Sequence, residues 1–218
     1  YVRETLAENP CCTEEVQLFI LSGSENNFFS SIGNNLAENL SVSKVIQAKL
    51  KDTWILSSKL AANLNLDAEI QIEMANKWFS LGLDELAENP SCTSNVQAII
   101  ANREDYDTYL PPLAKNKNCL SSIQLKIAES NNEYAKLNLI RNKNITMDVQ
   151  EVFLRDDKTT WTILKELIAN QHITDKVKVI ARQKMDSIFN FIHSLNTAES
   201  WVLCGLAESE KIDQNTQY

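Results

Sequence analysis

One short motif recurs along most of the chain, and this repeat constrains the fold more than any other feature. Seven copies begin with leucine and read LAENP, LAENL, LAANL, LAENP, LAKNK, LIRNK and LIANQ. The leucines are separated by 30, 24, 26, 27, 26 and 28 residues, and they are Leu6, Leu36, Leu60, Leu86, Leu113, Leu139 and Leu167. Such a period is typical of arrays in which each unit buries its apolar side against its neighbours.

Within each repeat, positions are numbered from the leucine, which is position zero. Position +7 is Thr, Ser or Asp in six of the seven copies, and position +10 is Val or Ile in all of them. Position +14 is apolar throughout, so positions +10 and +14 form one stripe of a helix. Each repeat therefore predicts a first helix that ends near the leucine and a second helix that begins after a capping residue at +7.

Position +3 is asparagine in all seven copies, and we expect its role to be structural. The column consists of Asn9, Asn39, Asn63, Asn89, Asn116, Asn142 and Asn170. Asparagine can cap a helix end, because it tolerates the left-handed conformation there and its amide binds free carbonyl groups, and a stacked amide ladder between turns is the second structural role left open. Counting lost caps alone, Asn89→Ala is expected to destabilise the protein by about 1 to 2 kcal/mol without affecting binding.

These patterns predict an all-α fold, an α-solenoid of about seven two-helix repeats over residues 1–184. Residues 185–218 are expected to form a cap or an irregular eighth repeat of the same domain, with a further LAES motif at Leu206. The chain contains only four glycines and four prolines, too few for the many turns of a sandwich or barrel.

The motif resembles the leucine-rich repeat variant family, whose unit reads roughly L-A-x-N-P-x-T-x-x-x-[LV]. Residues 6–10 with Thr13 and Val16, and residues 86–90 with Thr93 and Val96, are most similar to it. The resemblance implies pairs of short helices, one of them often 3₁₀, stacked in a right-handed superhelix. Proline is kept in only two of the seven copies, and the spacing exceeds the family's repeat of about 24 residues, which makes the expected array more like HEAT repeats.

The charge of the chain is acidic and uneven. The net charge is −8, and residues 1–109 hold seven basic against sixteen acidic side chains. This balance disfavours nucleic acid as the partner, and no apolar stretch approaches the roughly 20 residues of a membrane span. Five cysteines without a CxxC pair predict free thiols. The odd number of cysteines and the lack of a signal-like leader in the chain shown lead us to expect a cytoplasmic protein, and the start at Tyr1 leaves open whether the chain is a fragment of a longer repeat array.

No pattern of residues predicts a catalytic, metal or cofactor site. His172 and His193 lack a second ligand at useful spacing, and the acidic clusters at 104–107 and 156–157 lack the order of a calcium loop. Cys12, Cys92 and Cys119 share position +6, which is otherwise Val, Leu or Ile, so they are expected to be small buried residues. We therefore expect a protein that is not an enzyme and holds no cofactor.

Position +12 is the candidate binding surface. It lies about 160° around the second helix from the buried position +10, yet it is apolar in six of seven repeats. We predict an apolar strip that contacts a partner, with acidic residues beside it. The candidate residues are Leu18, Ile72, Leu125 and Val179, with Glu14, Glu15, Glu69 and Glu73. In the alternative interpretation, neighbouring repeats bury this column, and Ile72 and Leu125 would then be almost fully inaccessible.

The predicted function is a non-catalytic interaction module that binds a protein or peptide of basic character. A bacterial scaffold, adaptor or immunity-type inhibitor fits this description, and the sequence leaves the partner and the oligomeric state open. The alternative is a nucleic-acid-binding helical-repeat protein of the DNA glycosylase-like type. Residues 110–184, with thirteen basic against eight acidic side chains, are the stretch that favours it.

Overall fold

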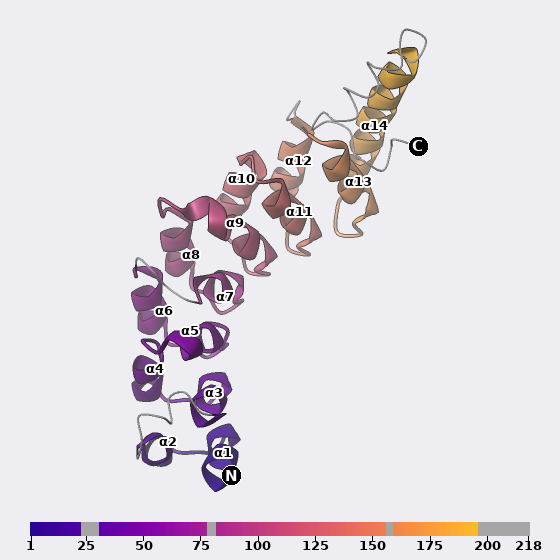
Figure 1. Cartoon of the computed structure of the whole chain (residues 1–218). Helices are drawn as coiled ribbons and strands as arrows, with labels where there is room; N and C mark the ends of the chain where they lie inside the picture. The colour runs from indigo at the N-terminus through magenta and orange to yellow at the C-terminus, as the bar shows by residue number, and fades with distance from the viewer. Residues whose placement is uncertain (23–30, 78–81, 156–158, 196–218) are drawn as a thin grey trace. The chain divides into compact units, whose positions relative to one another are not determined.

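The computed structural model describes residues 1–22, 31–77, 82–155 and 159–195, and this part of the chain is entirely helical (Figure 1). It contains fourteen helices and no strand, which confirms the predicted all-α class. The motif at Leu206 and most of the predicted cap lie outside the described residues.

The helices group into two compact units, residues 1–120 and 121–218. The first unit contains α1 (Val2–Glu8), α2 (Glu14–Leu21), α3 (Ser31–Glu38), α4 (Lys44–Leu50), α5 (Trp54–Ala61), α6 (Ala68–Ala75), α7 (Leu83–Glu88), α8 (Ser94–Ala101) and α9 (Tyr106–Lys115). The second contains α10 (Ser121–Glu129), α11 (Glu133–Arg141), α12 (Met147–Arg155), α13 (Trp161–Ala169) and α14 (Asp175–Leu195). The division falls inside the fifth repeat, between its first helix α9 and its second helix α10.

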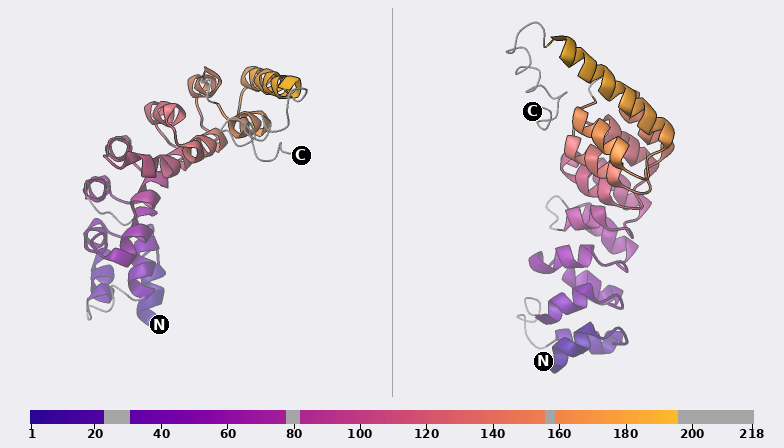
Figure 2. Two further views of the ribbon diagram at one scale, coloured as in Figure 1. Left: turned by 45° about the horizontal axis from the view of Figure 1, so that its top comes forward. Right: turned by 90° about the vertical axis from the view of Figure 1, so that its right-hand side faces the viewer.

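In the first unit the helices form two layers, one of first helices and one of second helices (Figures 1 and 2). In the layer of first helices, α1 packs on α3, α3 on α5, α5 on α7 and α7 on α9. In the other layer, α2 packs on α4 and α6 packs on α8. Leucines at position zero fill the space between the layers, and those of repeats two to five are fully buried: Leu36, Leu60, Leu86 and Leu113. Positions +10 and +14 of the second helices complete this core.

The second unit repeats the same packing with α11 on α13, α10 on α12 and α12 on α14. Val149 and Phe153, at positions +10 and +14 of α12, are buried there. Helix α14 is the longest described element and runs through residue 184, the predicted limit of the regular repeats.

Gly82 sets the approach of α7 to α5. It precedes α7 with φ of +91°, a left-handed conformation that side-chain-bearing residues rarely adopt. A Cβ atom at this position would lie 2.8 Å from the backbone oxygen of Ser57 and equally close to the Cα of Ser58. Glycine is therefore required for both the backbone conformation and the close contact.

Of the structural roles left open for the asparagines at +3, the left-handed helix end is not observed. Asn9, Asn89, Asn116, Asn142 and Asn170 end their helices in the extended region, with φ between −61° and −79° and ψ between 115° and 124°. Among the described residues, no side-chain-bearing residue has a positive φ. The physical reason is that the extended backbone directs the side-chain amide of asparagine toward the preceding repeat, where it forms hydrogen bonds.

Candidate interaction surface

The asparagines at +3 join successive repeats through their side-chain amides. Asn89 Nδ2 donates hydrogen bonds to the backbone oxygens of Ala61, 2.7 Å away, and Asn63, 2.9 Å away, both in the preceding repeat. Its Oδ1 accepts from the backbone N–H of Ser91 at 2.8 Å. Asn39, Asn63 and Asn116 repeat this pattern. We call this row the asparagine ladder.

A second ladder is formed by glutamine at position +11, which the sequence interpretation did not single out. Gln71 Nε2 donates to the backbone oxygens of Leu66 at 2.9 Å and Ser91 at 3.2 Å, and its Oε1 accepts from the backbone N–H of Thr93 at 3.0 Å. Ser91 and Thr93 belong to the following repeat. The glutamine ladder comprises Gln17, Gln47, Gln71 and Gln97 in the first unit and Gln124 and Gln150 in the second.

Position +12 directly follows the glutamine position and is accessible in all seven repeats. Side chains of Leu18, Ile72, Ala98, Leu125 and Glu151 are partly exposed, and those of Ala48 and Val179 are exposed. Neither Ile72 nor Leu125 is buried, so the burial that would have removed the apolar strip is not observed. Its role in binding stays a prediction, but the side chains that it needs are available to a partner.

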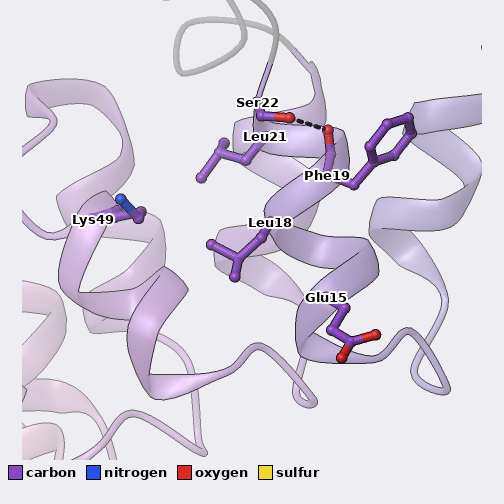
Figure 3. Close-up of a pocket in the computed structure, with 6 residues that line it drawn as sticks. All are labelled: Glu15, Leu18, Phe19, Leu21, Ser22 and Lys49. Atoms are coloured by element: carbon purple, nitrogen blue, oxygen red, sulfur yellow. Dashed lines mark hydrogen bonds between the residues drawn. The ribbon is translucent and has the colours of Figure 1, made fainter.

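An open groove of about 490 Å³ lies beside Leu18, between α2 and α4. Its lining consists of Glu15, Leu18, Phe19, Leu21, Ser22 and Lys49. Figure 3 shows that Leu18 and Leu21 point toward α4, which carries Lys49, whereas Phe19 and Glu15 extend on the other side of α2. The groove is therefore mainly aliphatic on its α2 wall and carries an ammonium group on its α4 wall.

Phe19 lines the groove and also adds exposed apolar surface on the other side of α2. Its side chain is 63% exposed, and the guanidinium group of Arg3 lies 5.4 Å from the centre of its ring. Arg3 also donates from Nη1 to the backbone oxygen of Ser22 at 3.3 Å, at the end of α2. The sequence interpretation missed Phe19 because position +13 varies between aromatic, aliphatic and charged residues and gives no periodic signal.

The four predicted acidic residues fall into two groups. Glu69 pairs with Lys44, and Glu73 pairs with Lys51 at 3.1 Å. The hydrogen bond with Glu69 is the main cause that raises the pKa of Lys44. Glu14 and Glu15 are exposed, and within the described segments neither forms an ion pair. Of these four carboxylates, the two without an ion pair are therefore the two that lie at or beside the groove.

In the second unit a charged residue interrupts position +12. Glu151 pairs with Lys176 at 2.8 Å and with Arg155 at 3.4 Å, and the hydrogen bond from Lys176 is the main cause that lowers its pKa. Leu125 is partly exposed, and Val179 is 48% exposed. The apolar column in the first unit consists of Leu18, Ala48, Ile72 and Ala98 and has no such interruption.

The cysteines of the described residues differ sharply in accessibility. Burial raises the pKa of both Cys92 and Cys119 to about 12, whereas Cys11, next to the half-buried Cys12, is exposed. The thiolate is the reactive form, so at pH 8 an aromatic disulfide reagent should modify Cys11 rapidly and leave Cys92 and Cys119 unreacted until the protein unfolds. Mass spectrometry of partly labelled protein measures this order. Labelling of Cys92 at the rate of Cys11 would contradict it.

The same pKa shifts predict a loss of stability in alkali. Between the ordinary thiol pKa of 9 and the folded value of about 12, the folded protein retains protons that the unfolded chain has released. The contribution of Cys92 and Cys119 to the free energy of unfolding is complete below pH 9 and decreases as the pH rises toward 12.

Comparisons with protein family models, with curated proteins and with solved structures find no match for this chain. Within the described segments, no helix has the length and apolar character needed to cross a membrane. The same segments contain no group of three or more His, Cys, Asp or Glu side chains placed to hold a metal ion.

Proposed function

We propose that this chain is a right-handed solenoid of the leucine-rich repeat variant type, with seven two-helix repeats and a degenerate eighth, that binds another protein. Both ladders occur in each unit at the same repeat positions, which supports one repeat type throughout the chain. A ladder that fixes each second helix against the next also fixes the spacing of their accessible side chains. An array of this kind is a suitable frame for an extended binding surface.

The observation that carries the proposal is the accessible apolar column at +12 together with the groove at Leu18. Aliphatic residues on a solvent-facing helix position serve no purpose in the core, which positions zero, +10 and +14 already fill. The groove provides a recess for a large apolar side chain, and its neighbours Glu14 and Glu15 offer charge to a basic flank. A segment that combines an apolar anchor with Lys or Arg has the matching chemistry.

The test compares partner capture by the unmodified chain and by Leu18→Asp. We expect the substitution to weaken binding of the captured partner about 30-fold, the loss typical of an anchor residue worth about 2 kcal/mol, because it places a carboxylate in the groove. The melting temperature should change little, since Leu18 is only partly buried. Calorimetry with the captured partner gives the affinity.

Leu64→Asp is the matched control, because Leu64 is an aliphatic side chain that is 50% exposed at position +4, on the loop between α5 and α6. Equal losses in Leu18→Asp and Leu64→Asp would contradict the proposed surface. Salt-sensitive retention of the unmodified chain on an oligonucleotide column would instead support the nucleic-acid alternative.

A further inference from the structure

The lysines on and directly after α4 differ in whether they have an acidic partner. Lys44, at the start of α4, pairs with Glu69, and Lys51, directly after α4, pairs with Glu73, so both are neutralised by carboxylates of α6. Lys49 is exposed, and no carboxylate of the described residues pairs with it. The ammonium group on the α4 wall of the groove is therefore uncompensated.

Opposite charges lie on the two sides of the groove. Leu18 and Leu21 point from α2 toward α4, which carries Lys49, whereas Glu15 extends on the other side of α2 (Figure 3). The carboxylate of Glu15, like the ammonium group of Lys49, is exposed and has no ion pair within the described segments. An apolar side chain bound against the two leucines would therefore have a positive group on one side and a negative group on the other.

The free ammonium group makes the groove sensitive to the charge of what covers it. A partner that fills the groove removes water from Lys49, and burying that charge without an acceptor is unfavourable. A carboxylate beside the bound apolar side chain offsets this cost, whereas a second cation would be repelled. The proposed function accounts for a basic group at the acidic side of the groove, and Lys49 adds the opposite requirement at the α4 wall.

We propose that Lys49 determines specificity in this groove by selecting a partner segment that carries an acidic side chain beside its apolar anchor. The anchor contacts Leu18 and Leu21, and the Asp or Glu of the partner pairs with Lys49. A Lys or Arg of the same segment faces Glu15, so the two charges also fix the direction in which the segment lies. This inference rests on the proposed function, because it specifies the partner of the same groove.

The test begins with a library of random peptides selected in parallel on the unmodified chain and on Leu18→Asp. Peptides that bind the unmodified chain and not Leu18→Asp depend on the groove. We expect these peptides to combine an aliphatic or aromatic residue with a nearby Asp or Glu on one side and a Lys or Arg on the other. One of them is then synthesised with an amidated C-terminus, so that its carboxylate belongs to a side chain.

Lys49→Glu should weaken binding of this peptide about tenfold, because an attractive pair of charges becomes a repulsive one. Exchanging the acidic residue of the peptide for lysine should restore binding to Lys49→Glu and weaken binding to the unmodified chain. Added salt should reduce both differences, since Lys49 is accessible to solvent. Calorimetry measures the four affinities, and thermal melting checks that the variant remains folded.

Lys165→Glu is the matched control. Lys165 is an exposed lysine of α13 without an ion pair among the described residues, and its substitution changes the net charge by the same amount. We expect the affinity for the peptide to stay within about twofold of the unmodified chain, because only the net charge changes. Equal losses in Lys49→Glu and Lys165→Glu would show a general charge effect and overturn the inference.

The remaining outcomes separate this inference from the proposed function. Groove-dependent peptides that lack an acidic residue, or that bind Lys49→Glu as tightly as the unmodified chain, would overturn the role of Lys49 and leave the groove as a binding site. Loss of binding on amidation would assign the carboxylate to a chain end and also overturn it. If no peptide distinguishes the unmodified chain from Leu18→Asp, the groove itself is contradicted and both proposals fail.

Discussion

Replacing Asn89 with alanine should lower the free energy of unfolding by about 3 kcal/mol. The side chain is 3% exposed, and its loss leaves the backbone oxygens of Ala61 and Asn63 without these donors and the N–H of Ser91 without its acceptor. Each buried polar group left unpaired costs about 1 to 3 kcal/mol, although partial relaxation reduces the sum. Urea unfolding followed by circular dichroism measures the change.

Asn9→Ala is the control within the same column. Among the described residues, the Asn9 side chain makes a single hydrogen bond, accepted from the backbone N–H of Cys11 at 2.8 Å. This side chain is exposed, so the expected loss is about 1 kcal/mol or less. Equal losses at Asn9 and Asn89 would show that asparagine acts within its own turn. That result would support the original expectation of about 1 to 2 kcal/mol from capping alone.

Gln71→Met should cost about as much, roughly 3 kcal/mol, because methionine fills the same volume without either polar group. Gln71 is 2% exposed and bridges the oxygens of Leu66 and Ser91 while accepting from the Thr93 N–H. The substitution therefore leaves one donor and two acceptors unpaired inside the protein. The loss should appear in the urea midpoint and as faster hydrogen exchange at the Thr93 amide.

Lys178→Met is the control at the same repeat position. It tests whether any substitution at +11 lowers stability, or only one that removes the glutamine hydrogen bonds. Lys178 is only partly buried and occupies the same repeat position without the glutamine pattern of bonds, so its replacement should change stability by less than about 0.5 kcal/mol. A small loss in Gln71→Met, similar to that in Lys178→Met, would mean that water replaces the amide at this junction.

The sequence predicts the helical class and the core well, because both depend on residue periodicity. Positions zero, +10 and +14 recur at helical spacing, and the structure buries them in most repeats. The role of asparagine was harder to predict, since the same residue suits a left-handed helix end and a bridge to the next repeat. Only the backbone conformation distinguishes the two, and it is extended at Asn89.

The sequence contains the glutamine column, but its buried hydrogen bonds are evident only in the structure. Six of seven repeats carry glutamine at +11, whereas two keep the proline and the capping position varies among Thr, Ser, Asp and, in one repeat, Leu. Glutamine is normally a surface residue, so a fixed column of it indicates buried hydrogen bonds only when read together with the repeat. Of the groove, the sequence predicted Leu18 and Glu15 but not Phe19, Leu21 or Lys49, because adjacency across α2 and α4 depends on how the helices pack.

In both ladders the side-chain amides form hydrogen bonds with backbone atoms of the adjoining repeat. This has a consequence for how such a protein can evolve. Backbone oxygens and N–H groups are the same whatever side chain a residue carries. The hydrogen bonds between repeats therefore do not depend on the side chains at the positions they contact. Gene duplication can then insert or delete a whole helix pair and leave every junction chemically complete. Variation in spacing from 24 to 30 residues between successive leucines is tolerated for the same reason, because insertions outside the asparagine and glutamine positions leave the joints unchanged.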